Sequence, residues 1–174
     1  GGGSGRILGG PRENRRIVRN MRKVGLYTEW GICMGCNACQ IACKDAHDLP
    51  LGVNLLKVRC RETRENGQIT VCFQPEACRQ CRNAPCVRAC LAGALFFRAD
   101  GTVGYQRELC SGCGSCGNAC PFGQIYPARP QPGIYRCDGC YERRQRGEEP
   151  VCVLACPVNC LRFAARDQRE EVCP

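Results

Sequence analysis

Histidine and long apolar runs are scarce in this sequence. His47 is the only histidine among 174 residues, which argues against catalysis by a cysteine or serine nucleophile with a histidine base. We expect His47 to be a partly exposed helix residue. No apolar run approaches the roughly 20 residues that a membrane-spanning helix needs, and no apolar signal-peptide segment follows the basic N-terminal residues. We therefore expect a chain that neither crosses a membrane nor carries such a signal.

Cysteine, by contrast, makes up 20 of the 174 residues, far above its ordinary use in globular domains. Such a count arises from disulfides in an oxidising compartment or from metal sites that bind thiolates. Sixteen of the cysteines fall into four quartets, whose spacing can separate these explanations. The quartets are Cys33, Cys36, Cys39 and Cys43; Cys78, Cys81, Cys86 and Cys90; Cys110, Cys113, Cys116 and Cys120; and Cys137, Cys140, Cys152 and Cys156.

The first and third quartets have the spacing C-x2-C-x2-C-x3-C of bacterial ferredoxins. Three thiolates on a tight loop can wrap one face of a [4Fe–4S] cubane, while the fourth points to a neighbouring cluster, so quartets work in pairs. The second and fourth quartets keep the outer spacings and insert residues between them. Small residues inside the loops let the backbone close around the cluster; they are Gly35, Gly112, Gly114 and Gly139.

Zinc and disulfides explain this spacing less well. Structural zinc occupies closed tetrahedral sites with paired knuckles, and two C-x2-C-x2-C-x3-C runs place too many thiolates too close together for that. Disulfides within such repeats would be crowded into strained local geometry. We therefore predict four [4Fe–4S] clusters, with all sixteen quartet cysteines as iron ligands and no catalytic residue.

The formal net charge of +9 would by itself suggest a nucleic-acid or anionic-membrane partner. A [4Fe–4S] core with four thiolates carries about −2, so four clusters would leave a net charge of about +1. We interpret much of the arginine excess as compensation for buried cluster charge. The basic composition is therefore a weak indication of nucleic-acid binding, and we predict no nucleic-acid partner.

Short strands and helices are expected between the cysteine groups. Residues 24–27 should form a strand. Residues 53–60 and 68–73 should form a hairpin across an Asn-Gly turn, and residues 94–98 and 102–105 a second hairpin across an Asp-Gly turn.

Helices are expected after the last cysteine of several groups, as at residues 42–47, and over residues 138–146. The apolar residues are too scattered for one large core, so something other than side-chain packing must supply much of the stability.

The two ends of the chain differ in composition from the rest. Residues 1–22 form a Gly/Arg-rich arm, in which the first five residues resemble an added flexible linker. Arg15 and Arg16 make a twin-arginine pair, but no apolar stretch follows, so a solvated basic arm is favoured over an export signal. We hypothesise that this arm docks onto a partner or a neighbouring copy. The cluster-binding domain is expected over residues 23–165, with a tail at 166–174.

Four cysteines lie outside the quartets, namely Cys60, Cys72, Cys160 and Cys173. Cys60 and Cys72 lie on the two arms of the first predicted hairpin and could approach each other. A free buried thiol at each position is the favoured interpretation.

The segments around the quartets resemble a known family. They read CMGCNACQIACKDAH, CFQPEACRQCRNAPCVRACLAGAL, CSGCGSCGNACPFG and CDGCYERRQRGEEPVCVLACPVNCLRF. Together they are similar to the dimethyl sulfoxide reductase iron–sulfur subunit family, whose four-cluster ferredoxin-like members accompany molybdenum and tungsten enzymes such as formate dehydrogenase or aldehyde oxidoreductase. The resemblance covers residues 23–163. Leu91 departs from a frequent proline, and Cys160 from a common alanine; we expect that neither touches a ligand, so the number of clusters is unaffected.

The resemblance implies an α+β fold of two interlaced bacterial-ferredoxin-like lobes, with short hairpins and helices around four clusters. It also implies that the first quartet pairs with the fourth and the second with the third. We name the resulting ligand sets sites 1 to 4. They are Cys33, Cys36, Cys39 and Cys156 (site 1); Cys43, Cys137, Cys140 and Cys152 (site 2); Cys78, Cys81, Cys86 and Cys120 (site 3); and Cys90, Cys110, Cys113 and Cys116 (site 4).

The resemblance further implies an electron-transfer subunit that is not an enzyme by itself. It would carry electrons between a catalytic molybdenum or tungsten subunit and a second redox partner. Self-association into a longer wire, and a free-standing diffusible polyferredoxin, stay open as alternatives, as does a metal-dependent structural or nucleic-acid-binding module. We expect a cytoplasmic location, with export to the periplasm attached to a partner subunit as the alternative.

Overall fold

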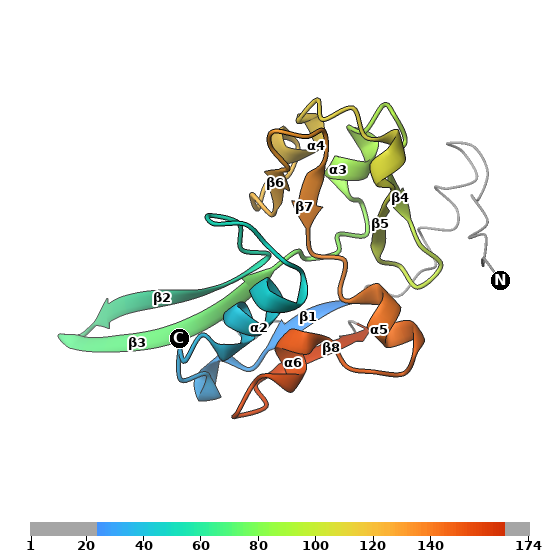
Figure 1. Ribbon diagram of the computed structural model, residues 1–174. Coiled ribbons are helices and arrows are strands. Elements are labelled where there is room, and N and C mark those ends of the chain that lie inside the picture. The colour runs from blue at the N-terminus through green and yellow to red at the C-terminus, as the bar shows by residue number, and fades with distance from the viewer. Residues whose placement is uncertain (1–23, 166–174) are drawn as a thin grey trace.

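Short antiparallel strand pairs and short helices make up residues 24–165, the part of the chain that the computed structural model describes (Figure 1). The predicted arm, the predicted tail, the twin-arginine pair and Cys173 lie outside the described residues. The strands are β1 (Val24–Thr28), β2 (Leu56–Glu65), β3 (Gln68–Ala77), β4 (Leu95–Phe97), β5 (Val103–Tyr105), β6 (Ile125–Pro127), β7 (Ile134–Arg136) and β8 (Leu161–Ala165). The helices are α2 (Ala38–Ala46), α3 (Pro85–Arg88), α4 (Ser115–Asn118), α5 (Tyr141–Gln145) and α6 (Val151–Leu154), with 3-10 turns η1 (Trp30–Ile32) and η2 (Arg107–Leu109).

The strands form four two-stranded antiparallel sheets, β1–β8, β2–β3, β4–β5 and β6–β7. The β1–β8 pair joins the two ends of the described chain, with Val24 opposite Ala165 and Thr28 opposite Leu161. The predicted strand at residues 24–27 is thus confirmed. The fold is α+β, and none of the helices among the described residues combines the length and apolar character that crossing a membrane requires.

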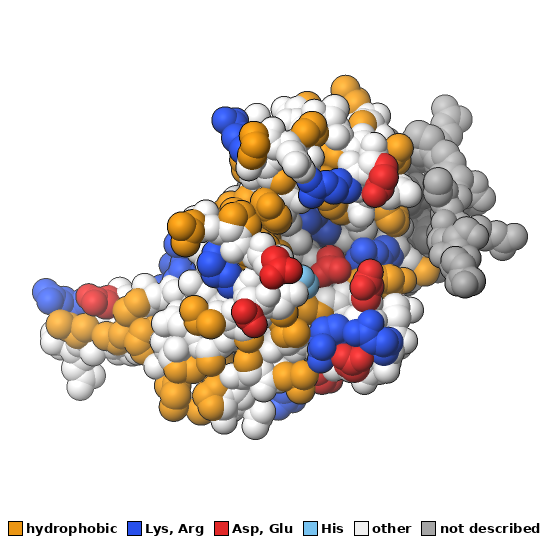
Figure 2. All heavy atoms as spheres, in the orientation of Figure 1, with side chains coloured by type: hydrophobic (Ala, Val, Ile, Leu, Met, Phe, Trp, Pro, Cys, Tyr) orange, Lys and Arg blue, Asp and Glu red, His pale blue; other side chains and the backbone are white. Residues whose placement is uncertain are grey.

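The first predicted hairpin is confirmed and is longer than expected. Strands β2 and β3 pair over ten residues, from Leu56 opposite Ala77 to Glu65 opposite Gln68. Asn66 and Gly67 at the turn both have positive φ, at 50° and 79°, as the tight turns that suit twisted hairpins require. This hairpin extends away from the rest of the molecule (Figure 1) and carries exposed hydrophobic side chains (Figure 2).

The second predicted hairpin is also confirmed, as β4–β5. Its turn is fixed by the Asp100 carboxylate, which accepts hydrogen bonds from the Thr102 backbone N–H at 3.0 Å and hydroxyl at 2.7 Å. A third hairpin, β6–β7, pairs Ile125 with Arg136. The sequence did not predict it, because residues 128–133 between its strands read ARPQPG and contain no Asn-Gly or Asp-Gly turn signal.

The helices differ from the prediction in a consistent way. They do not follow the last cysteine of a group but contain the third, as α3 contains Cys86 and α4 contains Cys116. Helix α2 already begins at Ala38, so the expected range 42–47 was too late. The reason is geometric, because the third and fourth cysteines of every quartet are four residues apart, about one helical turn.

The helix expected over residues 138–146 is also shorter than predicted. Gly139 and Cys140 have φ of 70° and 49°, values that a right-handed helix excludes. The cysteine loop therefore occupies this segment, and α5 begins only at Tyr141.

Two groups of buried side chains form the core, and cysteines are prominent in both. The first group includes Leu56 and Leu161 together with Cys39, Cys43, Cys152 and Cys156. The second includes Leu95 and Val103 together with Cys86 and Cys116. Elements from both ends of the described chain build the first group, whereas the middle of the chain builds the second (Figure 1). With so few large apolar residues, the core leaves much of the stability to be supplied by whatever the thiols bind.

Candidate metal centres

The first C-x2-C pair of each quartet turns through a left-handed residue directly before its second cysteine. These residues are Gly35, Gln80, Gly112 and Gly139, with φ of 71°, 44°, 72° and 70°. Three are glycines, which reach this conformation without steric cost. The expectation that small residues let the loops close is confirmed in their backbone conformation, and the second quartet is the exception because it uses Gln80.

The thiols of site 1 lie close together. Burial raises the pKa of Cys39 to about 11, and the nearby thiolates Cys156, Cys33 and Cys36 oppose its ionisation further. Cys39 belongs to α2, whereas Cys156 directly follows the last turn of α6 at the other end of the chain. The structure thus brings three cysteines of the first quartet beside the last cysteine of the fourth.

Site 2 is assembled from the same two quartets. Burial raises the pKa of Cys43 to about 12, with Cys137 and Cys140 as the nearest opposing charges. Burial also raises the pKa of Cys152, and the proximity of Cys140 and Cys43 adds to the effect. All four cysteines of the set therefore neighbour one another.

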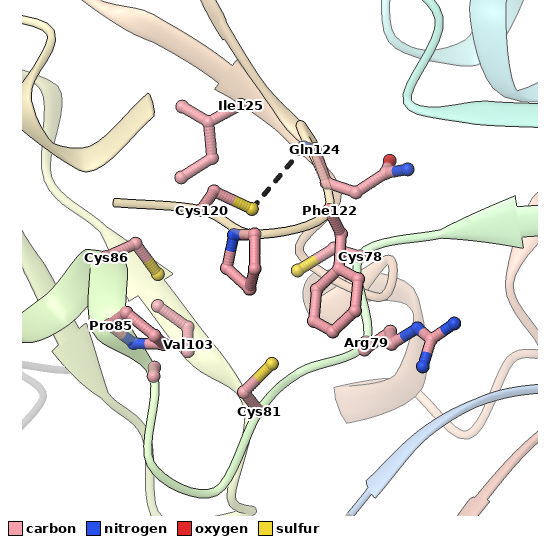
Figure 3. A pocket seen from close by; sticks show the side chains of 12 residues that line it. Cys78, Arg79, Cys81, Pro85, Cys86, Val103, Cys120, Phe122, Gln124 and Ile125 are labelled. Carbon is pink, nitrogen blue, oxygen red and sulfur yellow. Dashed lines mark hydrogen bonds between the residues drawn. The ribbon is translucent and has the colours of Figure 1, made fainter. Parts of the chain in front are cut away.

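Site 3 surrounds a cavity. Cys78, Cys81, Cys86 and Cys120 line it together with apolar residues that include Phe122, and their sulfur atoms point into the same space (Figure 3). Burial raises the pKa of Cys86 to about 11, the charge of Arg136 opposes this, and Cys78 and Cys120 raise it.

Site 4 is the most open of the four. Burial raises the pKa of Cys116, with Cys90 and Cys110 as its charged neighbours. Cys113 is exposed, and hydrogen bonding by Ser115 lowers the pKa of its thiol. Cys113 lies on the short loop between Cys110 and Cys116.

The donor sets fit iron–sulfur clusters, and the ferredoxin-like spacing of the quartets is what separates them from all-sulfur zinc sites. Every set consists of sulfur alone, and a buried thiolate without a compensating cation is costly, which is why burial raises these pKa values. Backbone N–H groups also point at several sulfurs, as Gly139 does to Cys137 at 3.4 Å and Gln124 to Cys120 at 3.5 Å. Such bonds stabilise a negative cluster. Ligation by the sixteen cysteines nevertheless stays a prediction, supported by this proximity.

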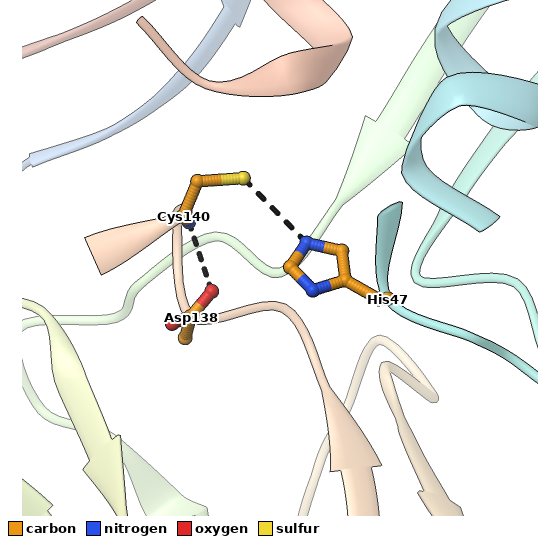
Figure 4. A group of neighbouring side chains, drawn as sticks. All are labelled: His47, Asp138 and Cys140. Carbon is orange, nitrogen blue, oxygen red and sulfur yellow. Dashed lines mark hydrogen bonds between the residues drawn. The ribbon is translucent and has the colours of Figure 1, made fainter. Parts of the chain in front are cut away.

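His47 lies against one of these sets. It caps the C-terminus of α2 and is half-buried, so the expected partly exposed position at a helix is confirmed. Its Nε2 is 3.6 Å from Cys140 Sγ, and Asp138 accepts the Cys140 backbone N–H at 2.8 Å (Figure 4). Among residues 24–165, these three residues are the only group of potential metal ligands whose ligand atoms all lie within 4.8 Å of one another. Because Cys140 belongs to site 2, the group borders that site rather than forming another.

The cysteines outside the quartets correct one expectation. Cys60 is free but exposed, and Cys72 is disulfide-bonded, so a free buried thiol at each position is wrong. Cys60 lies opposite Phe73 rather than Cys72. Because Cys60 is free, it is not the disulfide partner of Cys72. The physical reason is that only the base of this hairpin, at Leu56, Val58 and Ala77, packs against the first buried group, whereas Cys60 and Cys72 lie farther along its two arms.

The expectation that Cys160 touches no ligand is wrong, because it lies beside site 1. It is 3% exposed, and its Sγ is 3.4 Å from Cys156 Sγ. Its backbone N–H also donates to that sulfur at 3.3 Å. The sequence signal was present, since Cys160 follows Cys156 by four residues.

Four sets of thiols, all buried or half-buried apart from Cys36 and Cys113 and assembled from ferredoxin-like quartets, define an iron–sulfur protein. Comparison with known proteins then identifies its family. Residues 69–166 match the 4Fe-4S dicluster domain and residues 30–46 a 4Fe-4S binding domain. The chain belongs to the 4Fe-4S dicluster family and, within it, to the iron–sulfur subunits of the dimethyl sulfoxide reductase type.

Three relatives illustrate the match. The B subunit of the anaerobic dimethyl sulfoxide reductase of Haemophilus influenzae is 34% identical, over 85% of this chain and 77% of the relative. The thiosulfate reductase electron transfer subunit of Salmonella typhi is 37% identical, over 79% and 73%. The B subunit of the polysulfide reductase of Wolinella succinogenes is 35% identical, over 82% and 76%.

Gly35→Ala should destabilise the protein more than Gly114→Ala. Both positions have positive φ, so alanine costs about 1–2 kcal/mol at either. At Gly35, however, the new Cβ would lie 2.6 Å from the Phe73 ring, whereas Gly114 has nothing within 4 Å. We expect a lower thermal midpoint for Gly35→Ala, measured anaerobically with the iron content checked. Equal midpoints would show that the ring contact is unimportant.

Cys160→Ala should leave the iron content unchanged, because the four thiols of site 1 remain. Cys156→Ala, the matched variant four residues earlier in the chain, should lose about a quarter of the iron, from about 16 to about 12 atoms per chain. Iron and acid-labile sulfide analysis measures both. A loss of iron in Cys160→Ala equal to that in Cys156→Ala would make Cys160 the ligand instead.

Proposed function

We propose that this chain carries electrons through four [4Fe–4S] clusters between a catalytic molybdenum or tungsten oxidoreductase subunit and a second redox partner. The single observation that carries the proposal is the assembly of the sixteen quartet cysteines into sites 1 to 4. The relatives are named as electron-transfer or B subunits of reductases, which supports a role as a subunit that serves catalysis without performing it.

The assembly also supports a linear order of the four sites. Cys39 and Cys43 lie one turn apart on α2 and belong to sites 1 and 2. Burial and the proximity of Cys78 of site 3 raise the pKa of Cys137 of site 2, so these two thiols lie near each other. Cys86 and Cys90 then connect sites 3 and 4, again about one helical turn apart. We infer the path 1–2–3–4, with the two buried groups as interlaced ferredoxin-like lobes.

The chain itself supplies ligation, burial and hydrogen bonds, while the bound clusters would supply one-electron chemistry. Helices α2 and α6 present sulfurs of sites 1 and 2, and α3 and α4 present those of sites 3 and 4. Backbone N–H groups at Gly139 and Gln124 oppose the negative charge of the sulfurs that they contact. These tasks need no acid–base pair.

We also propose how the chain meets its partners and in which compartment it lies. We propose docking of the N-terminal arm onto a partner, and end-to-end association of copies is kept as a second arrangement. Cytoplasm is the proposed location, with export alongside a partner as the alternative. We expect the chain to co-purify stably with a molybdenum or tungsten subunit. Such co-purification would argue against a freely diffusing polyferredoxin.

Metal analysis of anaerobically purified protein tests the proposal. We expect about 16 iron and 16 acid-labile sulfide per chain, negligible zinc, and spin-coupled EPR signals after reduction. Zinc without sulfide would overturn the proposal and favour a structural metal module. Iron for only two clusters would keep the protein class but contradict the four-site assignment.

Removal of the clusters should unfold the chain. Metal binding is coupled to folding in small metal-binding domains, and cysteines occupy much of both buried groups. Treatment with a chelator and an oxidant should therefore abolish the near-UV circular dichroism along with the iron–sulfur absorbance. A cluster-free chain that retains its aromatic dichroism would show that side-chain packing is sufficient.

A further inference from the structure

Arg136 is the only buried charged side chain among residues 24–165, with 6% of its surface exposed. It ends β7 and directly precedes Cys137 of site 2. No ion pair found among the described residues includes it. A buried guanidinium without a carboxylate is costly unless another negative group compensates it.

The Arg136 guanidinium points toward a sulfur atom of site 3. Arg136 Nη2 donates to Cys78 Sγ at 3.4 Å, and Nη1 donates to the Val103 carbonyl. Its Nε is buried and has no hydrogen-bond partner in the described part of the chain. The guanidinium therefore donates hydrogen bonds to two neutral oxygens, those of Val103 and Gln80, and to the sulfur of Cys78. Among these described partners, only the Cys78 thiol can become negative.

Gln80 holds the other side of this arrangement. It is fully buried, its Oε1 accepts from Val103 N–H at 3.0 Å and from Arg136 Nη2 at 3.4 Å, and its Nε2 donates to the Cys137 carbonyl at 2.9 Å. Gln80 occupies the left-handed position that is glycine in the other three quartets. A side chain there is conformationally unfavourable by about 1–2 kcal/mol, and strain of this kind is concentrated at functional positions.

The pair thus lies between two sites. Arg136 reaches Cys78 of site 3, while Gln80 binds the backbone of Cys137 of site 2. A fixed cation beside a cluster stabilises the form with the extra negative charge, and charge and hydrogen bonds at the sulfurs set the reduction potentials of iron–sulfur clusters.

We propose that Arg136, acting through Cys78 and held by Gln80, raises the reduction potential of the cluster at site 3 relative to a site without it. This inference rests on the proposed function. Reduction adds one electron to the cluster at site 3. The positive guanidinium of Arg136 attracts this added negative charge.

The test is an EPR-monitored redox titration of the full chain, purified anaerobically, with Arg136→Met. We expect about 16 iron to be retained and one of the four midpoint potentials to fall. A tenfold change in the one-electron equilibrium constant corresponds to 59 mV, and a fall of about this size or more is expected. Arg136→Lys, which keeps the charge, should stay closer to the parent protein.

Arg64→Gln is the matched control, because Arg64 lies exposed near the tip of the β2–β3 hairpin and its loss changes the net charge equally. It should shift none of the four potentials. Four unchanged potentials in an iron-replete Arg136→Met protein would overturn the proposal and leave Arg136 a packing residue.

If Arg136→Met loses iron, the iron content and midpoint potentials of Arg136→Lys decide the test. Retained iron and parent-like potentials with lysine would show that the charge is what matters, as proposed. Loss of iron with lysine as well would show that the guanidinium shape is required for assembly, which contradicts the proposal. Absence of iron and sulfide from the parent protein would instead refute the proposed function.

Discussion

The spacing of one helical turn between the third and fourth cysteines of each quartet is the constraint on which the rest of this structure depends. Two sulfurs about one turn apart, roughly 6 Å along a helix axis, face different sets. In the proposed assignment the third cysteine, which lies on the helix, faces the set of its own loop. The fourth cysteine, which in three quartets follows the end of the helix, faces the neighbouring set. The chain must then return to complete each set, which is why Cys156 lies beside Cys39 and why β1 pairs with β8.

Much of this could be predicted from local sequence. The Asn66-Gly67 and Asp100-Gly101 turns fix two hairpins because only a few residues tolerate positive φ, and the glycines before the second cysteine of three quartets reach left-handed values for the same reason. Helix boundaries were harder. The segment from Asp138 is rich in helix formers, but the loop that presents Cys137 and Cys140 overrides that propensity.

Contacts between distant segments could not be predicted. Nothing local to His47 indicates that its ring lies 3.6 Å from Cys140, because 93 residues separate them. The prediction that Cys60 and Cys72 are free and buried was wrong for a similar reason. The alternation of residues along the two strands does not show that the hairpin extends away from the core. Gln80 did offer a local signal, because it replaces the glycine of the other quartets, but its partners, Val103, Arg136 and Cys137, are again distant in sequence.

The distribution of charge refines the initial interpretation of the basic composition. Most arginines among the described residues are exposed, where water and salt screen them beyond about 10 Å. Their effect on any one site is diffuse and similar for all four. Arg136 differs because it is buried, and at short range in a low-dielectric interior a single charge outweighs many screened ones. Compensation of cluster charge thus depends far more on the position of one side chain than on the formal net charge of +9.

Placement at the junction of sites 2 and 3 gives that charge a particular consequence for a linear path. On the proposed path 1–2–3–4, an electron passes from one buried group to the other at the step from site 2 to site 3, the one step not spanned by the third and fourth cysteines of a single quartet. A cation at this junction lowers the free energy of an electron on site 3, so it favours the crossing between the groups more than the steps within either. The strained Gln80 and the buried Arg136 are then two parts of one arrangement, in which local backbone strain positions a charge where the path leaves one group of sites for the other.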